Sequence, residues 1–148
     1  MGMHTLEEAR AEMLQAITPL AAETIPLSRA GGRVLATEAQ ATIDLPRFDN
    51  SAMDGWAVRA EDCLQDGAEL RIIGTSQAGA NAPPPVASGE ACRIMTGAPM
   101  PEGADAIVMI EDSEETDGLV RISGPARPNY IRRRGENLIL DQIALHAG

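Results

Sequence analysis

Residues 49–54 are rich in polar side chains and lie between Phe48 and Trp56, two of the three aromatic residues in the chain. Two carboxylates, an amide and a hydroxyl lie in this stretch, on Asp49, Asn50, Ser51 and Asp54. A loop of this kind could orient a polar ligand or hold a hard cation such as Mg²⁺. A polar turn capped by Asp and Asn, with two aromatic anchors, explains the same residues. Residue types alone leave both interpretations open.

A second candidate begins where a β-like run over residues 91–95 breaks at Thr96 and Gly97. Such a break can expose a hydroxyl and free backbone N–H groups to an anion. A Gly/Pro loop between two strands would look the same, because residues 97–103 contain two glycines and two prolines. Spacing alone does not decide between an anion site and a plain connection.

Three adjacent arginines, Arg132, Arg133 and Arg134, form a third candidate in an otherwise acidic chain. Their forked donors could bind phosphate or a similar oxyanion. On a strand the side chains would alternate, so at most two of the three would share a face. Ion pairing with the surplus acids, within the chain or between subunits, is the alternative.

Composition excludes several kinds of chemistry. The formal net charge is −10, so binding to nucleic acid or to an anionic membrane surface is not expected. All twelve basic residues are arginine, which removes Schiff-base, P-loop and Ser–Lys chemistry. His4 and His146 are the only histidines, too few for a multi-histidine metal site. Chemistry here would depend on carboxylates, hydroxyls, arginines and backbone groups.

The cysteine pattern and the hydropathy indicate a soluble, cytoplasmic protein. Cys63 and Cys92 have no CxxC neighbour, which argues against a zinc site and favours two buried free thiols. No apolar stretch approaches the roughly 20 residues of a membrane span. The first residues lack the charged-then-apolar order of a signal peptide. With 44% hydrophobic residues the chain can form a packed core.

One helix is predicted near the start of the chain. Thr5 and Glu8 fit a capping box, and apolar residues then recur at helical spacing until Pro19 ends the pattern. The predicted apolar face consists of Leu6, Ala9, Met13, Leu14 and Ile17. Ser28 could cap a short second helix, and residues 34–45 are expected to be extended.

Short β-like runs separated by glycine and proline follow residue 46. They cover residues 55–59, 69–73, 91–95, 106–110 and 119–122. No crossover helix is evident between them, which favours a small antiparallel barrel or sandwich. The acidic run 111–117 is expected to be a solvated hairpin turn, and residues 138–148 a strand or loop.

Four segments in order resemble the N-terminal region of the MoeA/gephyrin family of molybdopterin molybdenumtransferases. They are residues 30–36 (AGGRVLA), 45–58 (LPRFDNSAMDGWAV), 93–108 (RIMTGAPMPEGADAIV) and 129–136 (NYIRRRGE). The resemblance covers nearly the whole chain. It implies insertion of molybdenum from molybdate into adenylylated molybdopterin, with release of AMP and the help of Mg²⁺.

The resemblance also implies roles for individual residues. Asp54 and Thr96 fall on catalytic positions of the family. The positions that would bind substrate are Ser51, Gly97, Arg132, Arg133, Arg134 and Glu136. Metal ligands are not assigned. Asn137 stands where the family usually has aspartate, which keeps a carbonyl acceptor but loses the negative charge.

The fold implied by the resemblance is α+β. A helix-containing α/β dimerisation subdomain, residues 1–45 with 138–148, would carry an inserted, mostly antiparallel, barrel-like β subdomain at residues 46–137. Members of the family are longer and form homodimers. Their cleft lies between this region and the molybdopterin-binding α/β domain of the partner, so the chain is expected to be an N-terminal fragment, inactive alone.

Two alternatives to the fragment of an enzyme stay open. The first is a dimerisation or scaffold module of the same family that does no chemistry. The second is a carboxylate hydrolase that uses Asp49 and Asp54, although nothing in the sequence places these two groups across a substrate at a defined separation.

Overall fold

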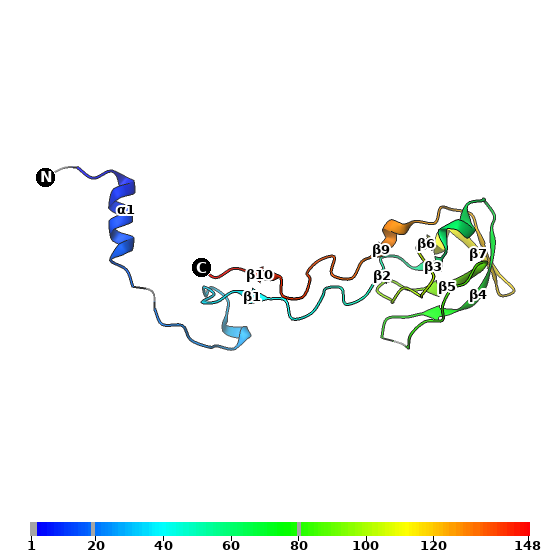
Figure 1. The fold of residues 1–148 in the computed structure, drawn as a ribbon, viewed down its shortest axis with the longest axis horizontal. Helices are drawn as coiled ribbons and strands as arrows, with labels where there is room; N and C mark the ends of the chain where they lie inside the picture. Colours follow the sequence, from blue (N-terminus) through cyan, green and yellow to red (C-terminus); the bar gives the residue numbers. More distant parts are fainter. Residues whose placement is uncertain (1–2, 19, 80) are drawn as a thin grey trace. The chain divides into compact units, whose positions relative to one another are not determined.

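The computed structural model describes residues 3–18, 20–79 and 81–148. Contacts between residues divide the chain into two compact units (Figure 1). We call residues 1–38 with 146–148 the terminal unit and residues 39–145 the β unit. Every strand among these described residues lies in the β unit. The predicted division after residues 45 and 137 stays a prediction.

The helix of the terminal unit is α1 (Leu6–Gln15). Thr5 Oγ1 accepts the Glu8 N–H at 3.2 Å, and the Glu8 carboxylate accepts the Thr5 N–H at 2.8 Å. The predicted capping box is therefore confirmed. The apolar face of α1 is exposed rather than packed, at Leu6, Met13 and Leu14.

Residues 16–45 contain less regular structure than predicted. The helix ends at Gln15, before Pro19, which lies outside the described residues. A single 3₁₀ turn, η1 (Leu27–Arg29), replaces the second helix expected at Ser28. Two glycines follow this turn, and glycine is a poor residue for continuing a helix. Within residues 34–45, only β1 (Ala39–Gln40) is a strand.

The core of the β unit is a six-stranded sheet with the order β6-β3-β5-β4-β8-β7. Its strands are β3 (Gly55–Val58), β4 (Glu69–Ser76), β5 (Glu90–Ile94), β6 (Ala106–Met109), β7 (Ser113–Thr116) and β8 (Leu119–Ile122). All pairs are antiparallel except β4–β5, which is parallel. The predicted class, α+β with a mostly antiparallel β part, is confirmed.

The parallel β4–β5 pair is the one exception in the main sheet to the mostly antiparallel arrangement that was predicted. Residues 77–89 connect β4 to β5 and return the chain to the end where β4 begins, and the described residues of this connection, 77–79 and 81–89, form no helix. Parallel neighbours need a connection of a dozen or so residues, and this loop supplies that length without a crossover helix. The absence of a helical pattern therefore did not exclude a parallel pair.

The acidic run 111–117 is also different from its prediction. Residues 113–116 form strand β7, paired with β8, and the hairpin turn lies at Asp117 and Gly118. Both turn residues have positive φ, 51° and 78°. An edge strand exposed to water tolerates acidic side chains. The acidic composition of residues 113–116 is therefore compatible with a turn and with an edge strand, and the pairing with β8 makes it a strand.

Two clusters of buried side chains pack against β3. Trp56 and Val58 belong to one cluster and Ala57 to the other, as expected for a strand whose successive side chains point to opposite faces. The β5 residues alternate in the same way: Ala91 joins the Trp56 cluster, and Cys92 joins the Ala57 cluster. β3 is buried along its whole length, which makes it the rigid centre of the β unit.

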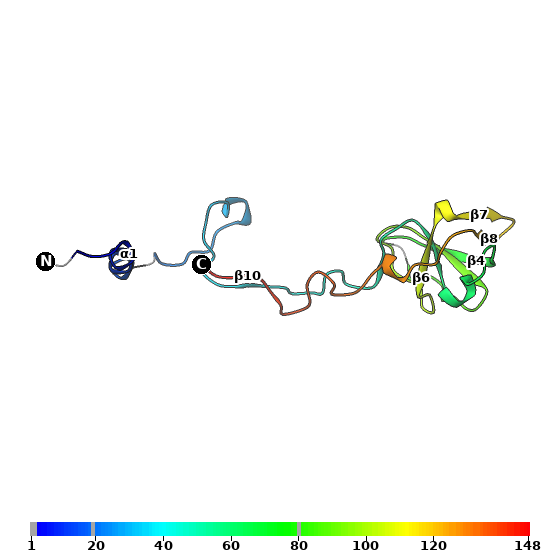
Figure 2. The ribbon, with the colours of Figure 1, turned by 90° about the horizontal axis from the view of Figure 1, so that it is seen from above.

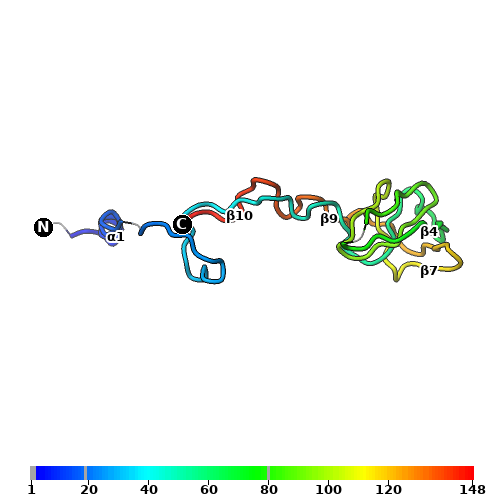
Figure 3. The backbone as a smooth tube through the Cα atoms, turned by 90° about the horizontal axis from the view of Figure 1, so that it is seen from below, coloured from blue at the N-terminus to red at the C-terminus, as the bar shows by residue number. Residues whose placement is uncertain are grey.

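Two distant segments run side by side beyond the main sheet, as Figures 1, 2 and 3 show in three views. β1 pairs with β10 (Ile143–Leu145), and β2 (Asn50–Ser51) pairs with β9 (Ile131–Arg132). A further antiparallel bridge joins Leu45 to Leu138. This pairing brings residues 44–54 against the arginine run.

No helix within residues 3–18, 20–79 and 81–148 is long and apolar enough to cross a membrane. Both cysteines have free thiols; Cys92 is buried, and Cys63 is half-buried at the end of η2 (Ala60–Cys63). The prediction of two buried free thiols is thus met fully by Cys92 and partly by Cys63.

Cys63 is expected to alkylate slowly in the folded protein. Burial, followed by the charges of Asp62 and Asp105, raises the pKa of its thiol from 9.0 to about 11. Because the thiolate is the reactive form, iodoacetamide labelling near neutral pH should be on the order of a hundredfold slower than in the unfolded chain. Mass spectrometry of labelled peptides measures both rates. Equal rates would contradict the buried environment.

Candidate active site

Asp54 and Thr96, the two predicted catalytic residues, are in direct contact. Asp54 Oδ1 accepts the backbone N–H of Thr96 at 2.6 Å and its hydroxyl at 2.8 Å. The two residues are 42 positions apart in the sequence. Both side chains are exposed at the surface of the β unit, where a ligand can reach them.

The register of β3 and β5 creates this contact. Gly55 at the start of β3 pairs with Ile94 at the end of β5, and the two strands are antiparallel. The residue before β3 and the residues after β5 therefore lie at the same edge of the sheet. Ile110, just after β6, reaches the same edge, where its N–H donates to the Asp54 carbonyl at 3.2 Å.

A tight turn after Thr96 is held by Ser51. Gly97 has φ 79°, a left-handed conformation that glycine adopts at little cost. Its N–H donates to the Ser51 carbonyl at 2.8 Å, and the Ser51 N–H donates to Ala98 at 3.0 Å. Ser51 is 1% exposed, and its hydroxyl bonds the Met53 backbone. The Ser51 hydroxyl thus forms its hydrogen bonds within the 48–54 loop.

Asp54 is held in its ionised form. The Thr96 backbone N–H, then the Thr96 hydroxyl, lower the pKa of this carboxyl below its ordinary value of 3.8, and the charge of Arg93 adds to the effect. Hydrogen bonds to a carboxylate favour the charged form. Asp54 therefore offers a carboxylate, and not a proton donor, at neutral pH.

All three arginines of the predicted anion site have acidic or amide partners within the chain. Arg133 pairs with Asp49 at 2.7 Å and Arg134 with Asp44 at 2.5 Å. Arg132 donates to the Asn137 side chain at 3.0 Å and lies 3.6 Å from Glu136. The alternative interpretation, pairing with the surplus acids, describes these contacts. Only Arg132 belongs to a strand, because residues 133–136 form a turn.

Glu136 and Asn137 shape that turn. Glu136 accepts the Arg133 N–H at 2.9 Å, and the Asn137 N–H donates to the Leu45 carbonyl at 2.8 Å. The Asn137 side chain uses its carbonyl oxygen as the acceptor for Arg132. Asparagine thus supplies here the acceptor that it shares with aspartate, without the charge.

β2 links the two groups of candidate residues. Ser51 pairs with Ile131 on one side and bonds the Gly97–Ala98 turn on the other. Asn50 is 6% exposed, pairs with Arg132 and donates to the Phe48 carbonyl at 3.2 Å. The loop at 48–54 is therefore a polar turn, as the structural interpretation predicted. The same loop also holds the exposed Asp54 carboxylate in place.

Comparison with known proteins shows the family of the chain. A family model described as the MoeA N-terminal region (domain I and II) matches residues 4–148. The chain belongs to the MoeA family. The molybdopterin molybdenumtransferase of Haemophilus influenzae is 41% identical over 149 residues, covering 99% of this chain and 37% of that protein. That of Synechococcus elongatus is 42% identical over 127 residues, covering 81% of this chain and 31% of that protein.

A solved MoeA structure has the same fold. The crystal structure of the molybdopterin biosynthesis MoeA protein from Pyrococcus horikoshii matches with a TM-score of 0.79 and 35% identity, covering 85% of this chain and 35% of that chain. The predicted family is thereby confirmed. The chain spans about a third of the length of these MoeA relatives.

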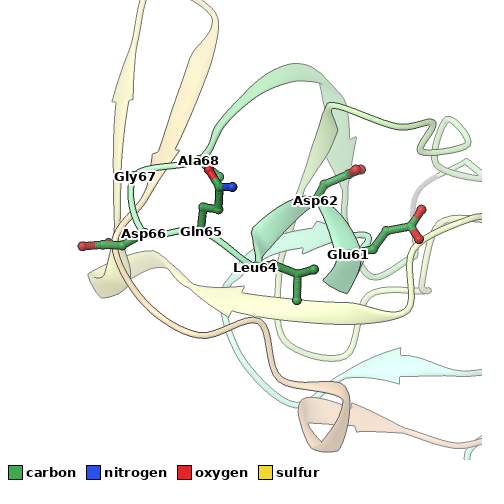
Figure 4. A pocket seen from close by; sticks show the side chains of 7 residues that line it. All are labelled: Glu61, Asp62, Leu64, Gln65, Asp66, Gly67 and Ala68. Atoms are coloured by element: carbon green, nitrogen blue, oxygen red, sulfur yellow. The ribbon is translucent and has the colours of Figure 1, made fainter.

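A hollow elsewhere in this MoeA chain does not form a second acidic site (Figure 4). It lies beside η2 and is lined by residues 61–62 and 64–68. Glu61 and Asp66 point away from each other in the close-up. The Asp62 carboxylate accepts from Ser88 and Gly89, each at 3.0 Å, and so fixes the start of β5. The carboxylates of this hollow do not converge.

Low pH is expected to loosen the turn around the arginines. Burial acts to raise the pKa of Asp49, but the Arg134 N–H and the Arg133 side chain together lower it below 3.8. The Leu140 N–H and Arg134 lower the pKa of Asp44 in the same way. A carboxylate whose pKa is lower in the folded than in the unfolded state stabilises the fold at every pH above its unfolded-state pKa. This stabilisation is lost as the pH falls through the folded-state pKa.

The amide proton of Arg134 reports this change directly, because it donates to Asp49 at 2.7 Å. Its NMR chemical shift should titrate with a midpoint below pH 3.8, the ordinary value for aspartate. The Asp49→Asn variant, which keeps an acceptor but does not ionise, should show no such step. A midpoint at or above 3.8 would contradict the ion pairing described here.

Proposed function

We propose that this chain supplies the Asp54–Thr96 side of the active site of a molybdopterin molybdenumtransferase. The reaction inserts molybdenum from molybdate into adenylylated molybdopterin and releases AMP. The observation that carries the proposal is the contact between an ionised, exposed Asp54 and Thr96. This contact occurs in a chain whose relatives carry the name of that enzyme.

In this proposal Asp54 presents a fixed carboxylate to the substrate, and its hydrogen bonds to Thr96 support that role. One oxygen, Oδ1, takes both Thr96 donors, so the carboxylate is fixed in orientation. The other oxygen is then directed by the same two bonds and can contact a substrate group or a cation. A preoriented charge of this kind contributes to catalysis without reorganising during the reaction.

Mg²⁺ fits this site only if the substrate provides most of the ligands. Within residues 3–18, 20–79 and 81–148, no three His, Cys, Asp or Glu side chains are grouped to hold a metal. Mg²⁺ in phosphate-handling enzymes is commonly bound by one or two carboxylates, with substrate phosphates and water completing the shell. Asp54 is the carboxylate that we propose, and the cation would neutralise phosphate charge there.

We propose different tasks for the other predicted substrate-binding residues. Gly97 keeps the turn beside the substrate, and Ser51 holds that turn in place. The paired side chains of Arg132, Arg133, Arg134 and Glu136 fix the segment that backs the site. In this proposal they position the loop and do not themselves contact the substrate.

We also propose that the protein is a cytoplasmic homodimer whose partners are small molecules and the α/β domain typical of the enzyme. Exposed apolar side chains within single elements support a further interface. The helix α1 exposes Leu6, Met13 and Leu14. In the β unit, the adjacent residues Ile139 and Leu140 are exposed as well. Neighbouring apolar side chains exposed to water can mark a contact surface.

A chimera tests the proposed function. The chain replaces the matching N-terminal region of the Haemophilus influenzae enzyme, with which it shares 41% identity over nearly its whole length. The purified chimera is given adenylylated molybdopterin, molybdate and Mg²⁺, and AMP release is measured. Turnover that depends on this chain supports the proposal. A chimera that folds and dimerises but does not release AMP would instead favour the scaffold module.

A further inference from the structure

Arg93 lies beside the Asp54–Thr96 contact but is absent from the residues that the sequence singled out for the site. It sits on β5 and pairs with Trp56 of β3, so the two side chains share a face of the sheet. Its guanidinium carbon is 5.1 Å from the centroid of the Trp56 ring. Trp56 is 1% exposed, and its ring N–H donates to Ser113 at 2.8 Å, so the stacking surface is held rigidly.

The Arg93 side chain has a donor without a partner in the described part of the chain. Its Nε is buried and has no hydrogen-bond partner within the described residues. The carboxylate that pairs with it, Glu115, is 3.7 Å away, beyond hydrogen-bond range. An arginine carries five N–H donors in a planar fork, and a buried donor without an acceptor calls for an explanation. The side chain is 27% exposed, so its outer edge is open to a ligand.

The three arginines of the 132–134 run are in the opposite situation. Arg133 and Arg134 each form a close ion pair, and Arg132 bonds an amide oxygen. Their charges are therefore largely matched within the chain. Arg93, by contrast, combines open donors with a position only three residues before Thr96. It is better placed than the arginine run to receive an anion at this edge of the sheet.

Charge supports the same assignment. An anion that approaches Asp54 meets a carboxylate held in its ionised form, which repels it. A fixed positive charge next to that carboxylate offsets the repulsion. Arg93 already acts on Asp54 electrostatically, and its stacking on Trp56 keeps it in place. Arginine forks suit tetrahedral oxyanions because two parallel N–H groups can each donate to one oxygen.

We propose that Arg93 is a further substrate-binding residue of this site and that its guanidinium binds one tetrahedral oxyanion. Both substrates of the proposed reaction provide such a group, as the phosphate of the adenylate or as molybdate. The inference rests on the proposed function for the identity of the ligand. It rests on the geometry of Arg93, Trp56 and Glu115 for the existence of the site.

Tryptophan fluorescence of the 148-residue chain tests the proposal. Trp56 is the only tryptophan, and the guanidinium lies over its ring, so an anion on Arg93 should change the emission. AMP and tungstate are titrated separately, as probes for the phosphate and for the molybdate. We expect a saturable change with at least one of them and a Kd on the order of 1 mM, typical of a single anchoring contact. The probe that saturates identifies the source of the oxyanion.

Three variants make the test specific. Arg93→Met, which keeps much of the packing on Trp56, should weaken binding at least about tenfold. Glu115→Gln removes the competing carboxylate and should tighten binding roughly two- to fivefold. Arg71→Met is the matched control, because it removes the same charge from an exposed ion pair with Glu90 and should leave the titration unchanged.

The outcomes separate this inference from the proposed function. No saturable change with either probe, or a Glu115→Gln variant that binds no tighter, would overturn the role of Arg93 even if the chimera releases AMP. If Arg93→Met fails to fold, by circular dichroism, the Glu115→Gln result decides. Binding that requires Arg93 in a chain whose chimera is inactive would keep the anion site and remove the enzymatic proposal.

Discussion

Gly55→Ala is expected to unfold the β unit or to destabilise it by at least about 3 kcal/mol, in the range reported for severe overpacking. A Cβ at this position would lie 2.0 Å from the Val108 carbonyl oxygen and 3.1 Å from the Met109 Cα. Both are backbone atoms of β6, which pairs with β3 along its whole length. Relief of the clash would therefore separate two paired central strands.

Urea unfolding followed by Trp56 fluorescence measures this loss, because Trp56 is a buried residue of β3. A lower midpoint with an unchanged slope would give the change in stability. Gly89→Ala is the matched control: its φ is 74°, but a Cβ there meets nothing within 4 Å. That variant should lose only about 1–2 kcal/mol, from backbone strain. Equal losses in the two variants would contradict the close approach of β6 to β3.

Asp54→Asn is expected to lower AMP release by the chimera about a hundredfold or more, in the range found when one preoriented electrostatic group is removed. The substitution removes the negative charge but keeps a carbonyl oxygen that can accept both Thr96 donors. Stability should therefore change by less than about 1 kcal/mol, as is usual for exposed positions. Single-turnover measurement of AMP release, with a urea unfolding curve of the same variant, separates the two effects.

Asp66→Asn provides the comparison for Asp54→Asn. Asp66 is exposed in the hollow beside η2, so the variant makes the same chemical change away from Thr96. It should release AMP at the wild-type rate. If Asp54→Asn turned over as fast as Asp66→Asn, Asp54 would have no catalytic role, and the Asp54–Thr96 contact would be structural only.

The local elements could be predicted because their causes are close together in the sequence. Thr5 and Glu8 cap α1 from three positions apart. The five predicted β runs all contain a strand, since alternating apolar residues between glycines and prolines suit few other structures. The structure of residues 111–117 was harder to predict, because acidic side chains indicate exposure to water and say nothing about backbone pairing. The partner strand β8, and not the composition, decides that residues 113–116 form β7.

The candidate site was predicted in part, through motifs and not through geometry. The resemblance to the family selected Asp54 and Thr96 together, but residue types alone left each in an ambiguous polar loop. For the arginine run, the sequence left anion binding and ion pairing open as alternatives. The structure provides partners for all three side chains. Antiparallel pairing of residues 45–51 with 131–138 brings Asp49 to Arg133 and Asp44 to Arg134, whereas Arg132 finds Asn137 and Glu136 in its own turn.

The sequence by itself determined the family, the capped helix, the positions of five strands of the main sheet and the absence of lysine chemistry. Only the tertiary structure decided that Asp54 accepts two hydrogen bonds from Thr96, that β4 and β5 are parallel, and that Arg93 stacks on Trp56 with open donors. The physical reason is the distance along the chain. Capping and alternation depend on neighbouring residues, whereas these contacts depend on strand register, which the whole β unit sets through its packing.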